Sequence, residues 1–83
     1  MEGRLEKARR KIDALDRAIA RLLGRRFALA AGLGPLKRTA RDPRREARVL
    51  SNISRLTRPA FRKAARAAYA EIIRQSRLLQ GSR

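Results

Sequence analysis

Apolar residues recur at a regular spacing through the first part of the chain. With Leu5 as heptad position a, nine of the ten a and d positions from Leu5 to Leu36 are apolar. Such a sustained 3.5-residue repeat is typical of a long helix whose apolar seam packs against another helix. We predict one helix from about residue 4 to the low or middle thirties, about 45 Å long at 1.5 Å per residue. The rest of the chain is too short to cover this helix, so we expect a second copy of the chain to cover it.

Glycine and proline predict where this first helix ends. Gly32-Leu33-Gly34-Pro35 disturbs the repeat, because Pro35 lacks an amide donor and clashes with the carbonyl of Ala31. We expect either a kink there or an early helix end followed by a last turn through Lys37. The connector to the next helix is expected at residues 38–41.

Two shorter helices follow. Asp42-Pro43 is a helix start, because Asp caps free amides and Pro suits the first helical position. We predict a second helix from about Pro43 to Leu56. After Thr57 and Arg58, we predict a third helix from Pro59 or Ala60 to Gln80, with Gly81 just beyond its end.

Composition excludes several kinds of catalytic and metal site. The chain contains no Cys and no His, which excludes zinc sites built on them, Ser-His-Asp triads and Cys-His nucleophile pairs. We therefore expect no metal held by Cys or His. The longest nearly apolar run, residues 27–36, is too short to span a bilayer, so we expect no membrane partner. The first residues lack the apolar core of a signal peptide, and we expect a cytoplasmic protein.

The charge of the chain points to an anionic partner. Lys and Arg number 23 against 7 Asp and Glu, and the formal charge of +16 is typical of nucleic-acid-binding proteins. The 43% of hydrophobic residues, arranged with a helical period, argue against disorder. The pattern therefore predicts one folded all-α domain over residues 1–83, with three helices.

Arg26 interrupts the apolar seam at an a position. A buried Arg without a partner is costly, so an anion should meet it, either a side-chain carboxylate or the carboxylate of a ligand. Lys37 follows eleven residues later, which is almost three whole turns, so both side chains would project from one face if the helix persists. The alternative for Lys37 is a solvated side chain at a helix end.

Three other polar residues have a structural as well as a functional interpretation. Arg9 flanks the seam about 25 Å from Arg26 along a helix, so the two can hold one small ligand only if they come from different chains. Spacing alone favours a surface role for Arg9. Ser76 and Gln80 are i and i+4 at the end of an apolar stripe, where they could line a pocket or fray into water.

A charged cluster marks the start of the second helix, at Asp42, Arg45 and Glu46. The helix dipole favours acids there, which explains Asp42 fully and Glu46 less well. Eight other arginines are most simply interpreted as solvated: Arg17, Arg21, Arg25, Arg48, Arg55, Arg62, Arg66 and Arg74.

Several cations, one Glu, one Ser and one Gln on three helices resemble the all-helical chorismate mutases. The resemblance runs from about Leu5 to Gln80 and is carried by four segments in the family's order and near its spacing: Ala8–Asp16, Leu22–Arg26, Asp42–Glu46 and Ile72–Gln80. It implies an intertwined homodimer in which the long first helices pair. Each of two active sites would then draw on both chains.

The resemblance also implies how the two carboxylates of chorismate are bound. Arg26 would grip one carboxylate, and Arg9 of the partner subunit would grip the other. Arg45 and Ser76 would be supporting contacts.

The same resemblance implies how the ether oxygen and the ring are recognised. Lys37 and Gln80 would hydrogen-bond the ether oxygen. Glu46 would accept a hydrogen bond from the ring hydroxyl, with the backbone of Asp42 nearby. An apolar wall would come from Leu33, Val49 and Ile73. The pericyclic rearrangement of chorismate to prephenate needs no proton transfer, covalent intermediate or metal, so the resemblance implies no metal and no cofactor.

The sequence departs from the family pattern in three ways. Pro35 is unexpected so close to Lys37, the connectors before Asp42 and Pro59 are short, and the excess of Arg is larger than one dianion requires.

Alternative functions come from the same fold and from other classes. Isochorismate-pyruvate lyases and aminodeoxychorismate mutases resemble the same frame, although Glu46 and Ser76 favour the mutase. A basic helical nucleic-acid-binding protein is a third possibility. The few aromatics argue against the binding of single strands by stacking, and Arg26 in the seam would have no purpose there. A plain coiled-coil dimerisation module is the fourth.

Overall fold

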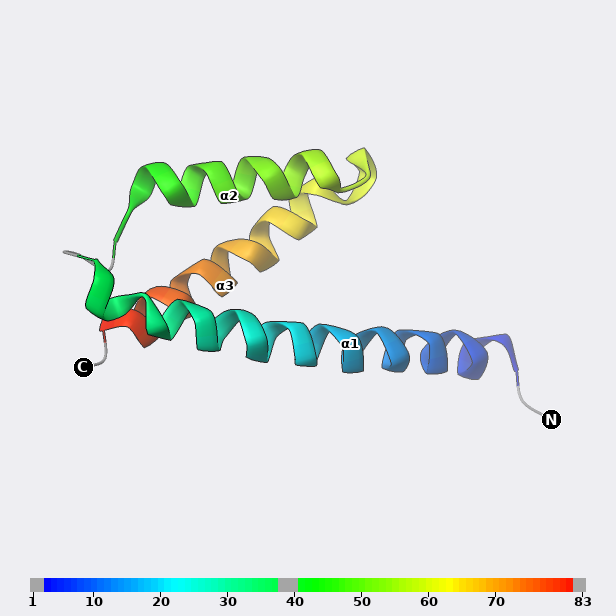
Figure 1. Ribbon diagram of the computed structural model, residues 1–83. Helices are drawn as coiled ribbons and strands as arrows, with labels where there is room; N and C mark the ends of the chain where they lie inside the picture. Colours follow the sequence, from blue (N-terminus) through cyan, green and yellow to red (C-terminus); the bar gives the residue numbers. More distant parts are fainter. Residues whose placement is uncertain (1–2, 38–40, 82–83) are drawn as a thin grey trace.

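The chain forms three α-helices, seen in a computed structural model that describes residues 3–37 and 41–81 (Figure 1). The helices are α1 (Arg4–Gly32), α2 (Pro43–Leu56) and α3 (Arg62–Gly81). Two single turns of 3-10 helix, η1 (Gly34–Leu36) and η2 (Pro59–Phe61), stand before α2 and α3. No strand occurs in these two ranges, so the prediction of an all-α chain with three helices is confirmed.

α1 ends early, as one of the two predicted alternatives has it, although the turn that follows stops at Leu36 and does not include Lys37. The helix stops at Gly32, and Pro35 falls in the first turn of η1, where its missing amide breaks no hydrogen bond. Lys37 then adopts an extended backbone, with φ −116° and ψ 145°. The long helix therefore does not persist to Lys37. Most of the connector predicted at 38–41 lies outside the described residues.

The two ends of α2 are closed by side chains. Asp42 caps the helix, since its Oδ1 accepts a hydrogen bond from the backbone N–H of Arg45 at 3.1 Å. At the other end, Arg62 Nε donates to the carbonyl oxygens of Ser54 at 2.7 Å and Thr57 at 3.0 Å. The Ser54 carbonyl also accepts the backbone N–H of Thr57 at 3.2 Å, so Arg62 adds a second donor there and ties the start of α3 to the end of α2.

The predicted end of the third helix is wrong by one residue. Gly81 is the last residue of α3 and not the first residue beyond it. No described glycine has a positive φ, so Gly81 does not make the left-handed turn that the prediction required.

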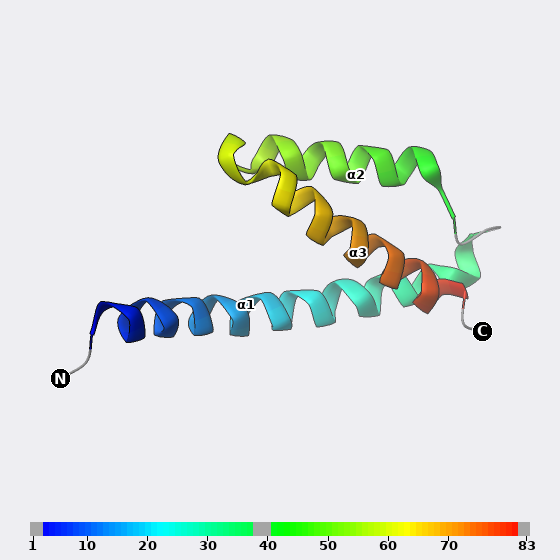
Figure 2. The same ribbon diagram turned by 180° about the vertical axis from the view of Figure 1, so that it is seen from behind.

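The helices are arranged around one end of α1. In Figures 1 and 2, α2 and α3 form a hairpin, and the carboxyl-terminal part of α3 lies against the carboxyl-terminal part of α1. The amino-terminal half of α1 extends past this pair, and the molecule measures 57 × 27 × 14 Å. The core of a single chain is therefore small. It contains the apolar Ala30 and Ile73 and the polar Ser76 and Gln80.

The predicted apolar seam is exposed in the single chain. Five of its members on the amino-terminal two thirds of α1 are between 51% and 62% exposed: Leu5, Ile12, Leu15, Ile19 and Leu22. An aligned apolar stripe of this length is typical of a surface that binds another helix. Within the ranges described, no helix is long and apolar enough to cross a membrane.

Candidate active site

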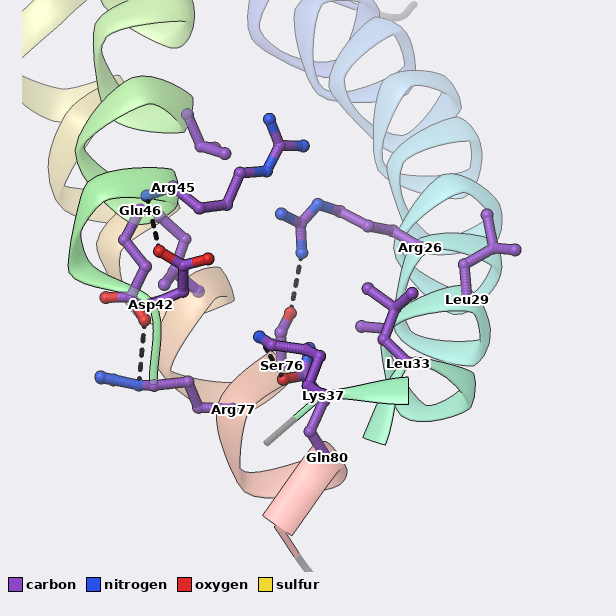
Figure 3. Close-up of a pocket in the computed structure, with 13 residues that line it drawn as sticks. Arg26, Leu29, Leu33, Lys37, Asp42, Arg45, Glu46, Ser76, Arg77 and Gln80 are labelled. Atoms are coloured by element: carbon purple, nitrogen blue, oxygen red, sulfur yellow. Dashed lines mark hydrogen bonds and ion pairs between the residues drawn. The ribbon is translucent and has the colours of Figure 1, made fainter. Parts of the chain in front are cut away.

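A cavity of about 300 Å³ lies where α1 and α3 meet the start of α2 (Figure 3). This volume is at the lower end of the range for small-molecule sites. Seven of the eight site residues predicted from sequence line it, together with all three residues of the predicted apolar wall. The full lining is Arg26, Leu29, Ala30, Leu33, Lys37, Asp42, Arg45, Glu46, Val49, Ile73, Ser76, Arg77 and Gln80.

Arg26 reaches into the cavity from α1 and is held there by α3 (Figure 3). Its Nη1 donates to Ser76 Oγ at 2.7 Å, and this hydroxyl donates in turn to the carbonyl of Ile72 at 2.8 Å. The guanidinium carbon lies 5.3 Å from the centre of the Tyr69 ring, a cation–π contact. No carboxylate in residues 3–37 and 41–81 forms an ion pair with Arg26. The intramolecular salt bridge considered for Arg26 is therefore not found among them.

Lys37 and Gln80 meet at the other end of the cavity. Although α1 ends before Lys37, the Nζ of Lys37 donates to Gln80 Oε1 at 3.0 Å. Gln80 is 8% exposed and Ser76 6% exposed, so neither side chain frays into water. Because Oε1 of Gln80 faces Lys37, its Nε2 group is the part that can donate to a ligand. Two N–H donors thus lie side by side.

The first turn of α2 contributes the third group of polar residues. Figure 3 shows the Arg45 guanidinium extending into the space between α1 and α2, on the side of Arg26. Glu46 Oε2 lies 3.5 Å from Arg77 Nε of α3, and the two side chains are 19% and 24% exposed. The amino terminus of α2 adds partial positive charge beside them.

Positive charge predominates in the cavity lining, and one wall is apolar. Four cationic side chains face two carboxylates, namely Arg26, Lys37, Arg45 and Arg77 against Asp42 and Glu46. Leu33, Val49 and Ile73 provide the apolar wall. Such a lining suits a small anionic molecule with an apolar ring. No cluster of His, Cys, Asp or Glu that could hold a metal ion occurs in the part of the chain that the structure describes.

The chain matches one known protein family over most of its length. The family model for chorismate mutase type II matches residues 8–81. The chain belongs to the chorismate mutase type II family. Chorismate mutases are isomerases of aromatic amino acid biosynthesis, and they bind chorismate and rearrange it to prephenate. No curated protein and no solved structure matches the chain.

Arg9 is the site residue predicted from the chorismate mutase resemblance that does not line this cavity. It lies on the amino-terminal part of α1, where its Nη1 pairs with Glu6 Oε1 at 3.0 Å and its side chain is 60% exposed. This is the surface position that spacing alone favours. A role in the site of a second chain stays a prediction.

One charged residue that lines this cavity has no role predicted from the sequence. Arg77 lies four residues after Ile73 and three before Gln80, so all three project from one side of α3. This spacing was a usable signal, but neighbouring exposed arginines in the same helix hid it. Leu29 and Ala30 also line the cavity without having been predicted to do so.

Proposed function

We propose that the protein rearranges chorismate to prephenate in the cavity between α1, α2 and α3. The observation that carries this proposal is the meeting of two donors, Lys37 Nζ and Gln80, beside two guanidinium groups that have no carboxylate partner among the described residues. Chorismate has an ether oxygen, which the two donors could bind, and it has carboxylates, which guanidinium groups could bind.

To catalyse this reaction, the enzyme must position the substrate and stabilise the charge of its transition state. A C–O bond breaks as a C–C bond forms, so the enzyme must hold a flexible dianion in a chair-like shape. Negative charge develops on the ether oxygen in the transition state. A fixed cation and a fixed neutral donor stabilise that charge at little cost of reorganisation. We assign these roles to Lys37 and Gln80.

The remaining polar groups bind the ends of the substrate. We assign one carboxylate to Arg26, which Ser76 holds in place at 2.7 Å, with Arg45 as a second cation. Glu46 would accept a hydrogen bond from the ring hydroxyl, beside the backbone of Asp42.

We also propose that residues 1–83 act as one catalytic domain located in the cytoplasm.

We infer that the active form is an intertwined homodimer. The exposed apolar seam of α1 supports this inference, since pairing with a second α1 would bury it. Arg9 lies about 25 Å along the helix from Arg26, too far to share a ligand within one chain. In a pair of long helices, the partner subunit's Arg9 could reach the second carboxylate.

Subunit mixing tests this assignment. Arg9→Ala and Arg26→Ala should each inactivate the enzyme. After subunit exchange in a 1:1 mixture, half of the dimers are hybrids with one intact site, so about a quarter of the wild-type activity should return. The matched control mixes Arg26→Ala with Lys37→Ala, which both alter a chain's own cavity and should not complement. Hybrids seen by native mass spectrometry without recovered activity would contradict the role of Arg9.

A second prediction concerns the donor at position 80. Gln80→Glu should lower kcat/KM near neutral pH by about a hundredfold, because an ionised carboxylate cannot donate to the ether oxygen. Activity should rise as pH falls, since the protonated carboxyl group can donate again. The pH–rate profile of Gln75→Glu, on the same helix outside the cavity, is the control. A flat profile for Gln80→Glu would count against this role.

Product analysis separates the mutase from its relatives on the same frame. The purified protein is incubated with chorismate and, separately, with isochorismate, and products are identified by chromatography. We expect prephenate from chorismate and no pyruvate from isochorismate. Pyruvate release from isochorismate, with chorismate unchanged, would instead support a lyase.

A further inference from the structure

Arg77 is a charged residue in the cavity lining to which the proposed mechanism assigns no role. It enters from α3, and its Nε lies 3.5 Å from Glu46 Oε2 of α2. Both side chains are at least three quarters buried, so water screens the pair less than it screens a surface ion pair. Figure 3 shows the two residues on the opposite side of Ser76 and Gln80 from α1.

The ion pair has two consequences for Glu46. It involves Oε2, which leaves Oε1 to accept a hydrogen bond from a ligand. It also balances the charge of Glu46, so this corner of the cavity is an acceptor with little net charge. A neutral hydroxyl group needs only the acceptor. An ammonium group would be attracted by Glu46 but repelled by Arg77, whose Nε lies 3.5 Å from Glu46 Oε2.

We propose that Arg77 positions Glu46 and makes this corner of the cavity select a neutral ring hydroxyl over a positively charged ring ammonium. The inference rests on the proposed function, because it assumes that Glu46 receives the ring substituent. It makes Arg77 a positioning and specificity-determining residue, which acts on the substrate through Glu46.

The test compares two substrates that differ only at this substituent. Chorismate has the hydroxyl, and 4-amino-4-deoxychorismate has an amino group in its place. For each variant, the ratio of kcat/KM for the amino substrate to that for chorismate is measured. A structural defect changes both values together and leaves the ratio unchanged, so the ratio responds only to selection between the substrates.

Arg77→Met should change this ratio. We expect kcat/KM for chorismate to fall about tenfold, because Glu46 loses the partner that holds it, and the ratio to rise at least about tenfold. Arg77→Lys, which keeps the charge, should keep the ratio within about threefold of the wild-type value. Arg77→Gln provides a second neutral variant if Arg77→Met does not fold.

Arg74 supplies the matched control on the same helix. Its guanidinium pairs with Glu71 at 2.7 Å, at the surface and away from the cavity, and this hydrogen bond lowers the pKa of Glu71. Arg74→Met should leave both kcat/KM values unchanged. An unchanged ratio in Arg77→Met and Arg77→Gln, with an active wild type, would overturn the inference and leave the proposed function standing. A wild type that converts neither substrate would overturn both.

Discussion

Lys37→Met is expected to lower kcat for chorismate by about a thousandfold, because it removes the cation assigned to the ether oxygen. Methionine keeps the length and apolar character of the side chain but cannot donate a hydrogen bond. The loss of the Lys37 ammonium group also releases Gln80 Oε1 from the 3.0 Å hydrogen bond that orients the amide. Both donors to the developing charge are therefore affected by one substitution.

Single-turnover measurement of chorismate decay tests this expectation, since it isolates the chemical step from product release. Lys63→Met, at an exposed position of α3 away from the cavity, is the control and should behave as wild type. A loss of less than about tenfold in Lys37→Met would show that Lys37 does not face the breaking bond.

Arg26→Leu is expected to abolish activity without destabilising the protein. The substitution removes the group assigned to a substrate carboxylate, and we expect kcat/KM to fall by about a thousandfold or more. Stability should hold or rise, because Arg26 carries a charge in a half-buried position with no carboxylate partner among the described residues. Leu also completes the apolar repeat, and Ser76 keeps its hydrogen bond to the carbonyl of Ile72.

Chorismate turnover and thermal denaturation, measured on the same preparation, test the two halves of this prediction. Arg25→Leu alters the neighbouring exposed arginine and should change neither quantity much. Loss of activity together with loss of folding would indicate that Arg26 serves the structure. Retained activity would remove Arg26 from the site.

The helices could be predicted from sequence because their causes are local. The heptad repeat predicted α1 from the spacing of single residues, and Pro35 limited its end because proline removes an amide wherever it stands. Asp42 and Pro43 predicted the start of α2 for the same kind of reason, and the cap is present at 3.1 Å. Gly81 was misplaced by one residue, since α3 continues through it.

The interior of the site could be predicted only in part, because it depends on which helix faces meet. The burial of Ser76 and Gln80 depends on how α3 crosses α1, and spacing within α3 left pocket and solvent equally open. Lys37 reaches Gln80 from an extended residue after η1, so the continuous helix that would have put Lys37 on the face of Arg26 is absent, although both residues line one cavity. The pairing of Arg77 with Glu46 joins two helices and had no signature in either one alone.

The most direct test of the whole account is the fate of chorismate itself. The purified wild-type protein is mixed with chorismate, its decay is followed by absorbance, and the product is identified by chromatography beside an enzyme-free sample. We predict that chorismate is converted stoichiometrically to prephenate, far faster than in the enzyme-free sample. If chorismate decays at the uncatalysed rate in the presence of the folded protein, or if the product is not prephenate, the proposed function is contradicted.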